Sequence, residues 1–199
     1  MIGILLSSFA AMAILFLFFW KYWFLRNPDR DIPEGRRFLS PADGRVIEII
    51  ATDNRTSIPS FHSKKNCENI TQRGYRITVY LSLFDVHYQR APVDGQVVSL
   101  HYVPGHFFPA FSPKARRNER NEILFDNQEL GGIKLIQVAG ILARRIKCFV
   151  IEGENITKGQ VIGVIRFGSR VIFSIPALDL KIRKGQRVKA GQTVIAEYR

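Results

Sequence analysis

The first twenty residues, MIGILLSSFAAMAILFLFFW, constrain this chain more than any other segment, because no charge occurs from Ile2 through Trp20. A helix of about 20 apolar residues spans a hydrocarbon core of roughly 30 Å. Positive charge follows the run, and the aromatic residues of KYWFLR are typical of a membrane interface. A cleaved signal would have the opposite order, so we expect residues 1–26 to be a retained membrane anchor. Whether it spans fully or re-enters stays open.

The basic residues after the apolar run predict the orientation of the anchor. Lys21, Arg26 and Arg30 place the remainder on the cytoplasmic side of the cell membrane by the positive-inside rule. The net charge of +12 also fits a domain that faces anionic lipid. No helix-turn-helix, zinc-finger or RNA-recognition pattern accompanies that charge, so no nucleic-acid partner is expected. Two isolated cysteines, Cys67 and Cys148, predict neither a disulfide framework nor a metal site and fit a reducing compartment.

The rest of the chain is predicted to be mainly β. Residues 27–37 (NPDRDIPEGRR) form a juxtamembrane linker, and residues 38–199 contain short β-branched runs bounded by Gly, Pro or Asp. The helical pattern at residues 110–119 is weak. Two turn motifs occur twice: Pro-x-Asp-Gly-x-Val at Asp43 and Asp94, and Lys-Gly-Gln before two later strands. Such glycine-punctuated hairpins resemble the biotinyl/lipoyl-like (hammerhead) β-sandwich, which is the fold we expect.

Two segments carry candidate chemistry. In LSLFDVHYQRAPVDG, an apolar strand ends at Asp85 and His87, where a side chain can be presented into a site. In RFGSRV, the pair Gly168-Ser169 interrupts a strand, which marks either a simple bend or a reactive bond. A serine hydroxyl can attack the preceding carbonyl to form an ester if a base and oxyanion donors assist it. β-Elimination and hydrolysis would then convert the serine into a pyruvoyl group.

The segment ARRNERNEI interleaves arginine and glutamate and has two open interpretations. A solvated, salt-bridged face is the default for such a pattern. An anion-binding or loop-anchoring segment around residues 116–120 is the functional alternative, and the residue pattern favours neither.

Six motifs together resemble a known family. SPADGRV, LSLFDVHYQRAPVDG, YVPGHFFPA, NERNEI, QVAGILARRI and GVIRFGSRV occur in the order found in phosphatidylserine decarboxylase proenzymes of the short, membrane-anchored bacterial and archaeal type. The resemblance implies self-cleavage between Gly168 and Ser169 into a β chain (1–168) and an α chain (169–199). It implies a pyruvoyl cofactor made from Ser169 and no metal. It also implies a maturation triad in which Asp43 orients His87 and His87 deprotonates Ser169.

The implied function is the pyruvoyl-dependent decarboxylation of phosphatidylserine to phosphatidylethanolamine and CO₂. The implied partners are phosphatidylserine in the membrane, the paired α and β chains as a heterodimer, and further copies in a homo-oligomer. Asp85 is a second candidate for the carboxylate partner of His87, and Asp94 is expected to be purely structural. The alternative from the hairpin pattern is a non-enzymatic, membrane-anchored lipoyl-like adaptor.

Overall fold

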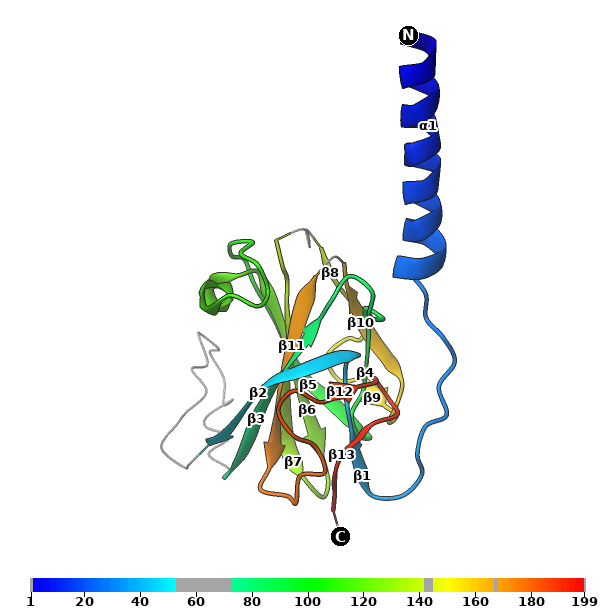
Figure 1. Cartoon of the computed structure of the whole chain (residues 1–199). Coiled ribbons are helices and arrows are strands. Elements are labelled where there is room, and N and C mark those ends of the chain that lie inside the picture. Colours follow the sequence, from blue (N-terminus) through cyan, green and yellow to red (C-terminus); the bar gives the residue numbers. More distant parts are fainter. Residues whose placement is uncertain (1, 53–72, 142–144, 167, 199) are drawn as a thin grey trace.

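A computed structural model describes residues 2–52, 73–141, 145–166 and 168–198 of the chain and has one N-terminal helix followed by a β domain (Figure 1). The helix α1 (Ile2–Phe18) continues into a π-helical turn, η1 (Phe19–Phe24). Residues Ser7–Phe24 have a mean hydropathy of 1.4 and lie almost entirely outside the β domain, so this segment is long and apolar enough to cross a membrane. The expected N-terminal apolar helix is therefore present.

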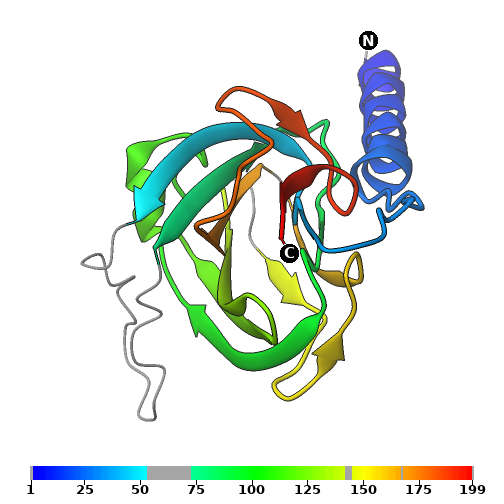
Figure 2. The same ribbon diagram turned by 90° about the horizontal axis from the view of Figure 1, so that it is seen from below.

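Eight strands form one antiparallel sheet in the β domain. They are β2 (Gly44–Thr52), β3 (Gly74–Leu81), β5 (Gly95–Val103), β6 (Arg120–Asn127), β7 (Gly131–Val138), β9 (Asn155–Ile156), β11 (Ser169–Pro176) and β12 (Arg187–Val188). Their spatial order is β12-β2-β3-β11-β7-β6-β5-β9. Register shifts in β2 and β5 add local twist, and the sheet curls around an interior when seen from below (Figure 2).

Two small sheets complete the domain. β1 (Arg37–Leu39) pairs with β13 (Val194–Glu197), and β10 (Val161–Ile165) lies between β4 (Tyr88–Arg90) and β8 (Ile146–Cys148). Alternation along the strands separates the core from the outer face. In β11, Val171, Phe173 and Ile175 are buried in the core, whereas Ile172 and Ser174 on the opposite face are partly exposed. The prediction of a mainly β domain is confirmed, while the comparison with lipoyl-like sandwiches is not.

The duplicated turns occupy equivalent places. Asp43 Oδ1 accepts a hydrogen bond from the backbone N–H of Ala190 at 2.7 Å, and Asp94 Oδ1 accepts one from Lys158 N–H at 2.8 Å. In each copy the residue after the N–H donor is a glycine in a left-handed conformation: Gly191 follows Ala190, and Gly159 follows Lys158. Each aspartate therefore ties its own strand to a distant glycine turn, as the repeated sequence frame suggested.

The segment between the N-terminal helix and β1 is docked on this pair of turns. Arg30 donates to Asp43 and to Gln192, and the side chain of Ile32 occupies the space beside Gly159 and Gly191 that a Cβ there would fill. The segment that joins α1 to the β domain therefore has a fixed path over the domain surface.

Candidate active site

Ser169 begins β11 at the point where the chain passes from one sheet to another. β10, in the three-stranded sheet, ends at Ile165, and Ser169 pairs with Leu81 of β3 in the large sheet. Gly168 has φ +53°, a left-handed conformation that glycine adopts without strain. The glycine in RFGSRV therefore serves a bend between two sheets rather than a bulge within one strand.

The hydroxyl of Ser169 is fully buried and has no hydrogen-bond partner among the described residues. Buried hydroxyl groups are nearly always hydrogen-bonded, because an unpaired one costs free energy. An unpaired hydroxyl next to a left-handed glycine is therefore a candidate reactive group.

A second backbone segment lies against the Gly168 carbonyl. A Cβ added at Gly140 would overlap the Gly168 oxygen, so the close approach requires glycine at position 140. Asn118 fixes this segment by donating from Nδ2 to the Ala139 carbonyl at 2.7 Å. It also donates from Nδ2 to the Phe108 carbonyl and accepts at Oδ1 from the Phe108 N–H. The motifs GHFFPA, NERN and QVAG thus meet next to the Gly168-Ser169 bond.

His87 is fully buried and presents one free ring nitrogen. Its Nδ1 lies 2.8 Å from the Asp85 backbone carbonyl, which can only accept, so Nδ1 carries the proton. Nε2 then has a free lone pair, and it has no partner within the described part of the chain. Burial lowers the pKa of His87 to about 4, so the ring is neutral at pH 7. The structure therefore holds His87 in the form that can accept a proton.

The end of the N-terminal apolar helix, at Phe24, covers this imidazole. The rings of Phe24 and His87 lie 4.2 Å apart between centroids, and Phe24 is itself fully buried. Arg26 donates to the Phe84 carbonyl in the loop just before His87. The N-terminal helix and the candidate site are therefore packed together. Sequence reasoning missed this contact, because no local pattern links residue 24 to residue 87.

A chain of buried amides holds the backbone of His87 from the other side. Asn121 donates to Gln137, Gln137 to Gln89, and Gln89 Nε2 to the His87 carbonyl at 2.6 Å. These residues also escaped the sequence analysis, although isolated glutamine and asparagine residues in apolar strands were a signal that could have revealed them. The network fixes the position of the imidazole relative to the large sheet.

The carboxylates do not bond to His87. Asp43 is buried and accepts from Arg30 at 2.9 Å and from Ala190, and Asp85 accepts from the backbone and hydroxyl of Ser82 at 2.8 and 2.7 Å. Burial raises the pKa of Asp43, opposed by the Ala190 N–H and Arg30. In the described structure, the group that orients His87 is the Asp85 carbonyl, and the expected Asp43–His87 contact is not formed.

The structure brings His87 and Ser169 to the same end of the domain. Ile165 N–H donates to the His87 carbonyl at 3.2 Å, and Ser169 pairs with Leu81, so the connection from β10 to β11 runs between these two contacts. The side chains of His87 and Ser169 are not hydrogen-bonded to each other. A proton donor, the Ser169 hydroxyl, and a proton acceptor, Nε2 of His87, are thus both buried and unpaired at the connection from β10 to β11.

The site contains no obvious metal ligands. Among the described residues, no group of three His, Cys, Asp or Glu side chains could hold an ion. Cys148 is free and partly buried, and Cys67 lies outside the described residues. Fold and site therefore define a β protein with an N-terminal apolar helix, a buried serine and a neutral histidine at a chain bend.

Comparisons with known proteins agree with that class. Residues 17–196 match the family model for phosphatidylserine decarboxylase. Proteins named phosphatidylserine decarboxylase proenzyme are similar to this chain in Carboxydothermus hydrogenoformans (37% identical, covering 100% of this chain and 89% of the relative) and in Streptomyces avermitilis (41%, 87% and 72%). One from Rickettsia bellii is 38% identical over 90% of this chain and 75% of its own length. The chain belongs to the phosphatidylserine decarboxylase family.

Proposed function

We propose that this protein is a self-processing, pyruvoyl-dependent lyase that decarboxylates phosphatidylserine to phosphatidylethanolamine. The family match and the names of the relatives support the reaction class. The observation that carries the proposal is a pair of buried, unpaired groups at the connection from β10 to β11. These are the Ser169 hydroxyl after a left-handed Gly168, and Nε2 of a neutral His87 whose carbonyl bonds to Ile165.

In the proposed maturation step, Nε2 of His87 takes the proton from Ser169 and the oxygen attacks the Gly168 carbonyl. The peptide C–N bond breaks and an ester forms. Loss of the Ser169 Cα proton then breaks the Cβ–O bond, releasing the β chain (1–168) with a new carboxylate at Gly168. The dehydroalanine that remains at position 169 takes up water and releases ammonia, which leaves a pyruvoyl group at the start of the α chain (169–199).

The residues present fit such a group. The Ser169 hydroxyl has no hydrogen bond to lose among the described residues, and no described carboxylate bonds to the His87 imidazole. A pyruvoyl group supplies an electrophilic carbonyl for the substrate amine and an electron sink for loss of the carboxylate. In the mature enzyme, His87 would hold or deliver a proton next to position 169. The orienting role of Asp43 stays a prediction, because its carboxylate bonds to Arg30 and Ala190.

The anchor supports a substrate that stays in the bilayer. The apolar helix ends in Phe24, which packs on His87, so a membrane that contained Ser7–Phe24 would lie near the site. We propose that the β domain lies on the cytoplasmic side, since basic residues follow the helix. The proposed assembly is the α/β pair, further associated as a homo-oligomer.

The decisive experiment is to purify the full chain and the Ser169→Ala variant in detergent. The unmodified chain should give two bands on a denaturing gel, with the α fragment lighter than the serine-started peptide by one ammonia. It should also release CO₂ from phosphatidylserine. Ser169→Ala should remain one inactive band. Ser174→Ala, on the outer face of the same strand, should be processed normally.

A single intact band from the unmodified chain would favour the alternative, a non-enzymatic membrane-anchored adaptor. A processed Ser169→Ala protein would contradict the assignment of the cleavage site. Activity without cleavage would contradict the pyruvoyl mechanism and leave the reaction class in place.

A further inference from the structure

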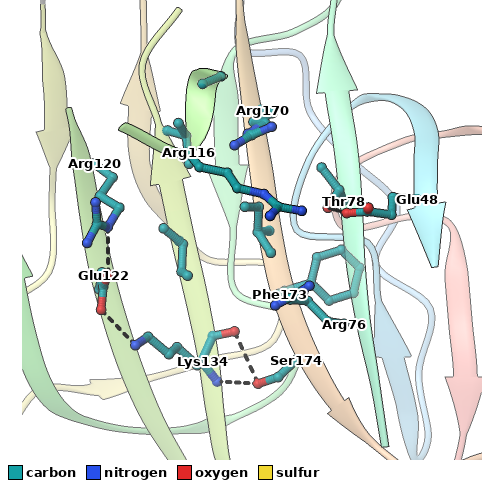
Figure 3. Close-up of a pocket in the computed structure, with 14 residues that line it drawn as sticks. Glu48, Arg76, Thr78, Arg116, Arg120, Glu122, Lys134, Arg170, Phe173 and Ser174 are labelled. Carbon is teal, nitrogen blue, oxygen red and sulfur yellow. Dashed lines mark hydrogen bonds and ion pairs between the residues drawn. The ribbon is translucent and has the colours of Figure 1, made fainter. Parts of the chain in front are cut away.

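A pocket of about 320 Å³ lies on the outer face of the large sheet, away from the core (Figure 3). Its walls come from β2, β3, β6, β7 and β11, and the short 3₁₀-helix η2 (Pro113–Arg117) contributes Ala115 and Arg116. Arg170 follows Ser169 directly, but strand alternation turns the two side chains to opposite faces. The pocket is therefore separate from the proposed active site.

Positive charge dominates this pocket. Of its described lining residues, five are cationic and two are acidic: Arg76, Arg116, Arg120, Lys134 and Arg170, against Glu48 and Glu122. Glu122 is paired with Arg120 at 2.8 Å and with Lys134 at 2.7 Å. The salt-bridged interpretation of NERNEI therefore holds for these two contacts of Glu122. Glu48 is then the one acidic lining residue that is not paired with Arg120 or Lys134.

Three arginines remain for one carboxylate. Within the described ranges, Arg76, Arg116 and Arg170 form no ion pair, and Glu48 accepts from the Thr78 hydroxyl at 3.2 Å. Figure 3 shows Arg116 extending into the pocket between Arg170 and Arg76. Like charges gathered in this way repel one another, so an anion among them would lower the free energy of the folded state.

Arg170 is the pocket arginine whose burial most favours binding of an anion. It is only 8% exposed, and its Nε has no hydrogen-bond partner among the described residues. Burial lowers the pKa of this guanidinium, the Glu48 carboxylate opposes that shift, and the neighbouring Arg116 and Arg76 add to it. A buried, unpaired charge is costly, and proteins usually satisfy it with an opposite charge.

Part of the pocket lining is apolar. It consists of Ile136 and Val138 of β7 and Ile172 of β11, on the sheet itself, and is called the apolar floor below. An apolar floor limits water and strengthens the attraction between an anion and the guanidinium groups. Guanidinium forks match the oxygens of phosphate in a bidentate manner, and three forks can share one tetrahedral anion.

We propose that this pocket binds a phosphate-class oxyanion, either free phosphate or the phosphate of an anionic phospholipid headgroup. Three unpaired arginines around a volume of about 320 Å³ fit one such group, with the apolar floor beneath it. The excess of positive charge excludes a metal cation as the ligand.

The test uses the full-length Ser169→Ala chain in a neutral detergent, so that its outcome does not depend on self-cleavage. The melting temperature is followed against sodium phosphate, with sodium chloride at matched ionic strength as the reference. A ligand that binds the folded state raises the melting temperature in a saturable way. We expect such a rise, and we expect Arg76→Gln and Arg116→Gln each to weaken the apparent phosphate affinity about tenfold or more.

Arg183→Gln is the matched control, since Arg183 is exposed and lies outside the pocket. It should respond to phosphate like the parent. Arg76→Gln and Arg116→Gln each remove one of several like charges, so they should melt no lower than the parent in chloride. Their loss of the phosphate response would then reflect binding and not unfolding.

A second arm replaces phosphate with dihexanoylphosphatidylglycerol, which carries a phosphodiester anion on a lipid. An arginine-dependent shift with inorganic phosphate identifies free phosphate as sufficient. A shift with the lipid alone identifies the headgroup as the source. No saturable shift with either probe would overturn the proposal, as would a shift equal in the parent, Arg76→Gln and Arg116→Gln, or one equally weakened in Arg183→Gln.

Discussion

At the residue scale, the protonation state of His87 follows from two neighbours of opposite character. The Asp85 carbonyl fixes the proton on Nδ1, and burial beneath Phe24 disfavours a second proton on Nε2. A histidine that paired with a carboxylate would instead have a raised pKa. The arrangement keeps a base available at neutral pH, and it makes folding sensitive to acid.

The acid sensitivity can be predicted with its sign. The pKa of His87 is about 4 in the folded chain against 6.5 as the ordinary value, so the unfolded state binds the proton first as pH falls. The contribution of His87 is therefore intact above about pH 6.5 and lost below about pH 4. The loss amounts to about 3 kcal/mol of unfolding free energy. Denaturant melts of Ser169→Ala at several pH values measure it.

The matched variant is His87→Asn in the same background. Asparagine keeps a donor for the Asp85 carbonyl but does not titrate, so its melts should show a shallower fall between pH 6.5 and pH 4. Identical pH profiles for the two proteins would contradict the buried, neutral state of His87.

The duplicated aspartates provide a second prediction. Asp43 and Asp94 each accept one backbone N–H, but Asp43 also pairs with buried Arg30. Asp43→Asn keeps the backbone bond and leaves Arg30 without its counter-charge, which should cost about 3 kcal/mol of unfolding free energy. Asp94→Asn should cost no more than about 1 kcal/mol. Equal losses of unfolding free energy in the two variants, measured by denaturant melts, would show that the Arg30–Asp43 ion pair does not contribute to stability.

Sequence patterns could identify Ser169 and His87 but not their surroundings. Gly-Ser within a strand and a histidine at a strand end are local signals. By contrast, Asp43 meets Ala190 across 147 positions, and its partner Arg30 lies in a segment that reads as a linker. Partners of this kind depend on the fold, so the expected Asp43–His87 contact could not be tested before the structure.

At the scale of elements, the turn η1 at the end of the N-terminal helix contacts the site directly. Phe24→Ala would remove the apolar cover of His87, and we expect the pKa of His87 to rise from about 4 toward 6.5. NMR titration of the imidazole measures this shift. Tyr22→Ala is the control, because Tyr22 is 60% exposed on the same turn. An unchanged pKa in Phe24→Ala would show that other groups bury the ring.

Gly140 gives a prediction for the contact between the segment after β7 and the bend. A methyl group at position 140 would overlap the Gly168 carbonyl, so Gly140→Ala should displace the bond that we propose to be cleaved and slow processing at least tenfold. Gly95→Ala also crowds a backbone carbonyl, that of Asp126, in a strand away from the bend. It should lower stability but leave processing intact. Time courses on denaturing gels distinguish the two variants.

Most long strands could be predicted from β-branched runs bounded by Gly, Pro or Asp, as in β5, which begins at Gly95 and ends at Val103 before Pro104. β6 was missed because its outer face carries Arg120 and Glu122, and the sequence there reads as a solvated charged segment. The helical pattern at residues 110–119 shortened to one 3₁₀ turn, since Pro113 starts it and Asn118 is already extended. Local charge and proline outweigh periodicity in such segments.

At the scale of the whole molecule, the proposed cut falls between sheets and leaves the strand pairing in place. The α chain would begin with β11, which lies between β3 and β7 in the middle of the large sheet, and would end with β13 on β1. We expect the cleaved protein to run as two bands under denaturing conditions and as one particle, of unchanged size, in native size-exclusion chromatography. Loss of the α fragment in mild detergent would contradict this.

The central position of β11 also makes refolding different before and after cleavage. The uncut chain can regain its sheet by a unimolecular reaction, because β11 stays tethered to β10 through residues 166–168. After the cut, the same strand must be found by a separate peptide at its bulk concentration, and the effective concentration supplied by the tether is gone. Refolding of the cut protein should therefore depend on dilution, whereas refolding of Ser169→Ala should not. The uncut precursor would then be the form that folds efficiently. The cut enzyme would keep the folded structure but would refold poorly once unfolded.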